Sequence, residues 1–326
     1  MTGVAVLLAA GLAWFGPGVT AQVAIDGDDI GGVVRSASGP EAGVWVIAET
    51  DDFNTLYRKT VVTGNGGRYV VPDLPDARYR VWVRGYGLKD SEPVTATPGT
   101  TLDLRAVTAA NPREAAQVYP ANYWYSLVEV PPKSEFPGTG ENGNGISPGM
   151  RSQANWIDGL KQGCQLCHQL GNQATREVLN PADFDSTEAA WAHRVKAGQR
   201  GALMSGGLRR FGPDRAVAMY ADWTDRIMAG EVPPAPPRPQ GRERDVVLTM
   251  WEWGGPTGYI HDEVASDKRD PRVNANGPIY GVEFASDGLV WVDPTTNEAR
   301  QVTIPVRDTP GEGGFRSYID QENLEP

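Results

Sequence analysis

The chain contains very little cysteine and histidine. Only two cysteines and three histidines occur in 326 residues. A disulfide-dense scaffold is therefore excluded, and the stability of the protein must come from ordinary hydrophobic cores. No Ser-His-Asp set, phosphate-binding loop or paired-carboxylate signature is readable, so the sequence predicts no catalytic residues.

Positive charge is scarce as well. The sequence has 30 Lys and Arg against 41 Asp and Glu, which gives a net charge of −11. Because the chain has no stripe of basic residues that could neutralise phosphate charge, nucleic acid is not expected as a partner. The segment 150–230, with 10 basic and 8 acidic residues, is the only part of the chain with an excess of basic residues.

Long apolar runs are absent too. The longest near the N-terminus, Val4 to Phe15, has 12 residues, whereas a membrane-spanning helix needs about 20. Its length suits the hydrophobic region of a signal peptide, and Val19-Thr20-Ala21 offers a small-residue cleavage site, although no Lys or Arg precedes the run. We therefore expect a signal peptide over 1–21 and a periplasmic or extracellular protein.

Residues 28–106 alternate Val, Tyr and Trp between turns such as SGPEAG and GNGG, which predicts the short strands of an antiparallel sandwich. The stretches GVWV at 43–46, GRY at 67–69 and LP at 74–75, followed by Tyr79, resemble the carboxypeptidase regulatory-like domain. That resemblance implies a transthyretin-like Greek-key β-sandwich over 22–110, an accessory module without catalytic residues. A spacer role is the favoured interpretation, with glycan binding as the alternative.

Two stretches have the composition of linkers. Residues 111–149 are rich in Pro, Gly and Asn, although several aromatic residues suggest that part of this stretch packs on a neighbour. Five of the seven residues at 233–239 are proline, which indicates an extended spacer over 232–244. Between them, helical periodicity and capping residues predict a small all-α domain over 150–231.

This helical segment contains both cysteines, in GCQLCHQLG at 163–171. Two cysteines at this spacing, followed by a histidine, have four interpretations: a disulfide, half a zinc site, a redox-active dithiol or a covalent haem. Zinc needs four ligands, a redox dithiol normally follows a strand, and a disulfide leaves His168 unexplained. The C-x-x-C-H spacing on a helix suits thioether bonds from Cys164 and Cys167 to a c-type haem, with His168 as an iron ligand.

Together with its helices, this motif resembles a class I monohaem cytochrome c. The resemblance implies a methionine sulfur as the sixth iron ligand, and Met204, in the glycine-rich stretch QRGALMSGGLRRFG, is the favoured candidate. His193 or an open site is the main alternative. Met219 shares a helix face with core residues, and Met228 falls in the last turn of its helix. Trp191 and Trp223 are interpreted as core or haem-pocket aromatics.

The segment 245–326 again shows residue patterns typical of β-strands. Residues 279–304 resemble one unit of a streptogramin-lyase-like β-propeller, which implies an incomplete propeller segment. The cluster of His261, Asp262, Glu263, Asp267 and Asp270 is interpreted as a solvated acidic loop, with a calcium site as the alternative. The expected fold class is thus multidomain: an N-terminal β-sandwich, a central all-α cytochrome c domain and a C-terminal partial β-propeller.

These expectations predict an exported c-type cytochrome that transfers single electrons through one haem c and its iron. The alternatives are an electron-accepting accessory part of a larger propeller enzyme, such as a dehydrogenase or lyase, and a carbohydrate- or surface-binding protein. The acidic surroundings of the helical segment favour a redox partner that is tethered or part of a membrane complex. The sequence carries no signal for the oligomeric state.

Overall fold

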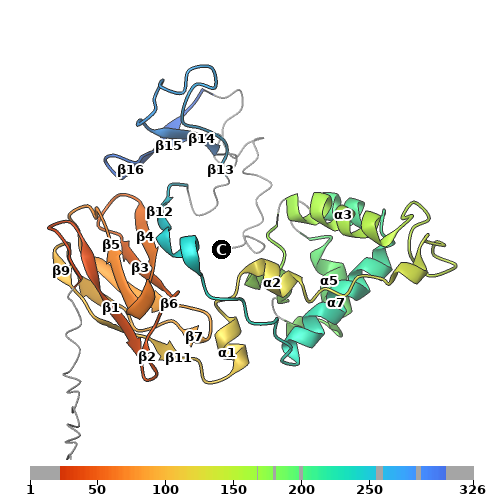
Figure 1. Ribbon diagram of the computed structural model, residues 1–326. Helices are drawn as coiled ribbons and strands as arrows, with labels where there is room; N and C mark the ends of the chain where they lie inside the picture. Colours follow the sequence, from red (N-terminus) through yellow and green to blue (C-terminus); the bar gives the residue numbers. More distant parts are fainter. Residues whose placement is uncertain are drawn as a thin grey trace, which may run out of the picture.

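A computed structural model of the chain describes residues 23–166, 168–178, 181–197, 201–254, 260–283 and 288–305 (Figure 1). The predicted signal peptide at 1–21 lies outside the described residues, as does Cys167. No described helix combines the length and the apolar character that crossing a membrane would require.

The N-terminal part is a β-sandwich. One sheet has the strand order β12-β4-β3-β6-β8; in the other, β1 pairs with β2, β5, β9 and β10. The strands are β1 (Ile30–Ser36), β2 (Gly39–Pro40), β3 (Trp45–Thr50), β4 (Leu56–Val62), β5 (Arg68–Val71), β6 (Tyr79–Arg84), β7 (Leu88–Lys89), β8 (Val94–Ala96), β9 (Thr100–Thr101), β10 (Leu104–Arg105), β11 (Val107–Thr108) and β12 (Val247–Glu252).

Alternation of side chains builds the sandwich core. In β4 the side chains of Tyr57, Lys59 and Val61 are buried, and those between them are more exposed, as expected for a strand with one face inward. Val46, Tyr79 and Val81 fill the same core and are fully buried. A β-rich N-terminal region is therefore confirmed.

Helices follow the sandwich along the chain. They are α1 (Pro112–Ala116), α2 (Ala121–Tyr125), α3 (Gln153–Gly163), α4 (Gln173–Arg176), α5 (Thr187–Arg194), α6 (Gly201–Leu208) and α7 (Pro213–Met228). Side chains of Asn111, Ser152, Asn172 and Ser186 cap the first turns of α1, α3, α4 and α5. Before α7, Gly212 has φ +100°, and a Cβ there would lie 1.8 Å from the carbonyl oxygen of Gly145. Only glycine allows this close approach.

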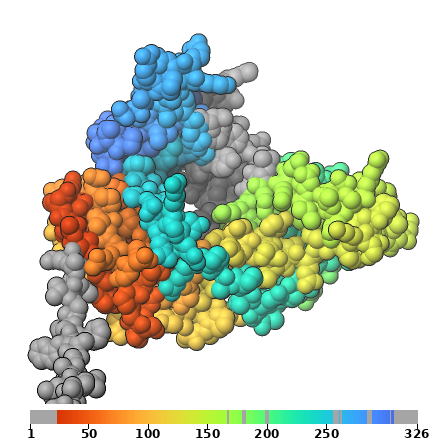
Figure 2. All heavy atoms as spheres, in the orientation of Figure 1, coloured from red at the N-terminus to blue at the C-terminus, as the bar shows by residue number. Residues whose placement is uncertain are grey.

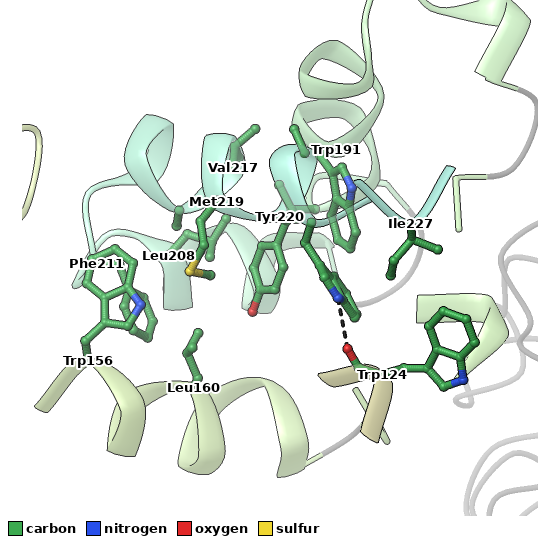
Figure 3. Packing of buried hydrophobic residues seen from close by; sticks show 14 of the residues in the cluster. Trp124, Trp156, Leu160, Trp191, Leu208, Phe211, Val217, Met219, Tyr220 and Ile227 are labelled. Atoms are coloured by element: carbon green, nitrogen blue, oxygen red, sulfur yellow. Dashed lines mark hydrogen bonds between the residues drawn. The ribbon is translucent and has the colours of Figure 1, made fainter. Parts of the chain in front are cut away.

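The helices share one aromatic core, drawn in Figure 3. Trp156 and Leu160 from α3 meet Trp223 from α7, and all three are fully buried. Trp156 packs edge-on against Phe211, with ring centroids 4.9 Å apart. Trp124 from α2 joins them, because its backbone carbonyl accepts a 3.0 Å hydrogen bond from the Trp223 indole N–H (Figure 3).

The prediction of a central all-α cytochrome c domain is wrong. Helical residues make up 27% of the described chain, and only α3 and α7 exceed eight residues. The helical core is also not confined to 150–231: Ala116, Tyr119 and Trp124 lie in it, and Tyr86 from the sandwich packs against it. Aromatic side chains bury large areas wherever they find a partner surface. The Pro- and Gly-rich composition around them does not reveal this burial.

The C-terminal part does not begin as a separate unit at residue 245, as the sequence predicts. Its first strand, β12, pairs antiparallel with β4 and so becomes the edge strand of the sandwich. After it, a single four-stranded sheet follows among the described residues, with the order β13 (Ile260–Val264), β14 (Ile279–Glu283), β15 (Gly288–Asp293) and β16 (Glu298–Thr303). An unpaired edge of β4 is a template for another strand, which explains why β12 joins the sandwich.

Candidate functional site

Helix α3 places Cys164 at the edge of the helical core. The Ser152 hydroxyl begins this helix by accepting a 3.1 Å hydrogen bond from the backbone N–H of Asn155. Trp156 and Leu160, one and two turns into the helix, anchor it in the core. Cys164 then stands at the C-cap, where it opens the 3₁₀ turn Cys164–Leu166 and is half-buried against the same core.

His168 follows one helical turn after Cys164. Its backbone N–H donates a 3.1 Å hydrogen bond to the carbonyl of Cys164, the i to i−4 bond of an α-helical turn. This bond brings the backbone of His168 back to the end of α3, and His168 is half-buried. Cys167, the second predicted attachment residue, lies outside the described residues.

A tyrosine hydroxyl contacts the Cys164 sulfur. The Tyr220 hydroxyl on α7 donates a hydrogen bond to Sγ of Cys164 at 3.4 Å. Burial, followed by the nearby Cys164 sulfur, raises the pKa of Tyr220 well above its ordinary value, so the hydroxyl keeps its proton. The ring of Tyr220 stacks on Trp191, with centroids 4.9 Å apart and planes at 18°.

Trp191 is itself held by a chain of buried hydrogen bonds. Its indole N–H donates to Oγ1 of Thr224 at 2.9 Å, and that hydroxyl donates to the backbone carbonyl of Arg176 at 2.9 Å. The Arg176 guanidinium lies 4.2 Å from the ring centroid of Trp124. Thr224 is fully buried. The side chains behind Cys164 are thus fixed by directional bonds as well as by apolar packing.

The candidate sixth ligands occupy different environments. Met204 lies on α6, half-buried against the helical core, whereas Met219 is buried within it, with its side chain directed from α7 toward α3 (Figure 3). His193 on α5 is exposed, and its ring centroid is 5.3 Å from that of Phe184. Met228 is 50% exposed at the end of α7. The assignment of Met204 stays a prediction.

The chemistry of the donor set fits a covalently bound haem. A thiol and an imidazole lie four residues apart in the chain, linked by the backbone hydrogen bond from His168 to Cys164, and an apolar, aromatic core borders Cys164. These are the donors of a C-x-x-C-H attachment site. The assignment of Cys164 and His168 to a haem site stays a prediction, and sequence reasoning missed the Tyr220 contact. The only signal for it was the position of Tyr220 in the apolar stripe of α7.

Acidic residues elsewhere form surface groups. Asp267 pairs with Arg269 and Asp270 with Arg272, while the side chains of His261 and Asp262 lie outside the described part. A different group, Asp26, Asp28 and Asp29, brings ligand atoms within 4.8 Å of one another among the described residues. Sequence reasoning missed it, although the spacing D-x-D-D was its signal. These carboxylates also accept backbone N–H groups of the same loop.

Comparison of the chain with models of protein families and with curated proteins found no match. The function is therefore inferred from the residues of the chain itself.

Proposed function

We propose that this chain is an exported electron-transfer protein that carries one haem, attached through Cys164 and Cys167, with His168 as an iron ligand. The observation that supports it best is the backbone hydrogen bond that links His168 to Cys164 at the end of α3, where Cys164 packs against a buried aromatic core. The proposal depends on this local arrangement and does not require a cytochrome c fold. When bound, a haem supplies reversible one-electron chemistry.

The surrounding residues have distinct roles in this proposal. Tyr220 holds the sulfur of Cys164 through its hydroxyl, and Trp191 stacks behind Tyr220 and excludes water from that side. A protein adjusts the reduction potential of such a group through hydrogen bonds to the sulfur and through burial. Met204 is proposed as the second axial ligand, with His193 as its alternative.

The charge distribution favours a tethered electron partner. The segment 150–230 has 10 basic and 8 acidic residues, whereas the whole chain carries −11. Long-range attraction of a freely diffusing acidic donor is therefore weak. We propose that electrons arrive from a membrane complex or another tethered protein.

A redox titration tests the proposal. The full chain is produced by secretion into a compartment that attaches c-type haem and is titrated while its visible spectrum is recorded. A single transition with one-electron slope is expected. C164A together with C167A should abolish the chromophore, while M228A, an exposed methionine of the same segment, should leave the transition in place. A folded, colourless wild-type protein would refute the function.

A further inference from the structure

A second site lies between the sandwich and the C-terminal sheet. There a pocket of about 400 Å³ is bordered by parts of the chain far apart in sequence, β4 with the loop after β5, β12, and the turn between β15 and β16. That volume falls in the range of roughly 300–1,000 Å³ typical of small-molecule pockets. Its lining includes Asp28, Tyr57, Lys59, Asp73, Thr249, Trp251, Thr295 and Asn297.

The strand pairing explains how the pocket forms. In the β12–β4 pair, Thr249 lies opposite Lys59, and Trp251 lies opposite Tyr57. Directly opposed residues share one face of a sheet, so β12 extends the inner face of the sandwich. The C-terminal sheet lies at the end of this extension (Figures 1 and 2), where Asn54 exchanges two hydrogen bonds, of 2.7 and 2.9 Å, with the backbone of Ala299.

Two buried polar groups in the pocket retain hydrogen-bonding capacity. Asn297 is 8% exposed, and its Oδ1 accepts a 3.0 Å hydrogen bond from the Trp251 indole N–H. Within the described residues, its amide NH₂ donates to no group. Lys59 is 7% exposed, and its Nζ donates to the carbonyls of Pro72 and Asp73, which uses two of its three protons. A donor that faces a pocket can bond a ligand there.

The charges around the pocket restrict what that ligand could be. The exposed carboxylates of Asp28 and Asp73 lie in the same pocket as the Lys59 ammonium, so the pocket offers hydrogen-bond acceptors as well as donors. A neutral ligand that both donates and accepts matches this mixture. It must accept hydrogen bonds from Asn297 and Lys59, donate to the two carboxylates, and offer an apolar face to Trp251. Sugar rings, with hydroxyl groups at the edge and C–H groups on the face, have this combination.

We propose that this pocket binds a small neutral saccharide. Trp251 provides the aromatic platform and fixes the Asn297 amide, whose NH₂ contacts a sugar oxygen. The site requires β12 and the turn before β16, so residues 22–110 alone do not bind. This inference is independent of the haem proposal, because no residue of the helical core borders the pocket.

Calorimetry on the full chain tests the inference, with glucose, galactose, mannose, N-acetylglucosamine, maltose and cellobiose as probes. We expect at least one of them to bind with a Kd of about 1 mM or tighter. The affinity should not change with ionic strength, because a neutral ligand forms no screened ion pair. Absence of binding by all six sugars to the folded protein, or binding only of glucosamine or glucuronate, would overturn the proposal.

Matched variants assign the binding to this pocket. N297G removes the amide but allows the positive φ of 57° at this position, and W251F removes the indole N–H while keeping an aromatic ring. Each should weaken the affinity by at least about tenfold. W291F changes a tryptophan on β15 of the C-terminal sheet that does not border the pocket and should bind like the wild type. Equal affinity in W291F, N297G and W251F would contradict the assignment.

Discussion

The hydroxyl of Tyr220 lies 3.4 Å from Sγ of Cys164 and joins the middle of α7 to the end of α3. Because Tyr220 is buried and stacked on Trp191, its hydroxyl is a fixed donor at the sulfur. Cys164, the proposed attachment residue, is therefore held by the core instead of projecting freely from a helix end.

Removal of this hydroxyl should release the thiol. In a haem-free C167A background, Y220F should make Cys164 react several-fold faster with a thiol reagent and should lower the free energy of unfolding by about 1 kcal/mol. Y79F is the matched control, since the Tyr79 hydroxyl is also bonded, at 2.8 Å to the Pro75 carbonyl, but lies in the sandwich. Equal thiol reactivity in both variants would show that Tyr220 does not position the sulfur.

The Trp191–Thr224 hydrogen bond should contribute measurably to stability. T224V keeps the shape of the side chain but leaves the buried indole N–H of Trp191 without its acceptor. We expect a loss of about 1–3 kcal/mol in urea unfolding, the cost of an orphaned buried donor. T224S retains the hydroxyl and should recover most of that loss, whereas equal losses in T224V and T224S would assign the effect to packing alone.

Met204 and Met219 should respond differently to truncation. M204A removes the proposed axial sulfur from a half-buried position, so the haem-loaded protein should become high spin or acquire a weaker ligand in its visible spectrum. M219A opens a cavity in the helical core and should cost about 2–5 kcal/mol in unfolding with the spectrum unchanged. An unchanged spectrum in M204A would transfer the axial role to His193 or Met219.

Acid should weaken the contact between the proline-rich segment and the sandwich. Burial alone would raise the pKa of Glu41, but hydrogen bonds from Ser36 and Arg238 outweigh it and lower the pKa below the usual 4.5. A carboxylate with a lowered pKa contributes stability above its unfolded pKa and loses it as the pH falls through the folded value. Near neutrality the free energy of unfolding of the wild type should exceed that of E41Q by about 1 kcal/mol. This difference should shrink below about pH 4.5.

Urea unfolding of both proteins across the acid range measures this difference. D90N is the control, since the exposed pair of Asp90 with Arg84 is expected to contribute little. A difference between wild type and E41Q that stays constant with pH would contradict the role assigned to the ion pair between Glu41 and Arg238, whose atoms are 2.5 Å apart.

Local signals predicted local structure well. The alternation in β4 and β6 and the apolar run in β3 mark real strands. A helix is found where capping residues predict one, although Ser186 caps α5 and not Asp185, the residue expected from the sequence. These features depend on residues a few positions apart, and the sequence displays such spacings directly.

Long-range partners could not be predicted in the same way. The pairing of β12 with β4, the burial of Trp124 in the helical core and the contact of Asn297 with Trp251 join residues about 50 to 190 positions apart. Periodicity shows which face of an element is apolar but not which distant surface covers it. This is why the predicted independent cytochrome c domain is wrong, whereas the spacing of Cys164 and His168 could be read directly from the sequence.

Covalent attachment of haem at Cys164 and Cys167 is the central claim, and the mass of the denatured protein tests it most directly. The account predicts that the secreted wild-type chain gains the mass of one haem, which acid-acetone extraction does not remove, and that the modified proteolytic peptide contains Cys164, Cys167 and His168. A wild-type protein with the unmodified mass, or a pigment that passes entirely into the acetone phase, would contradict the account.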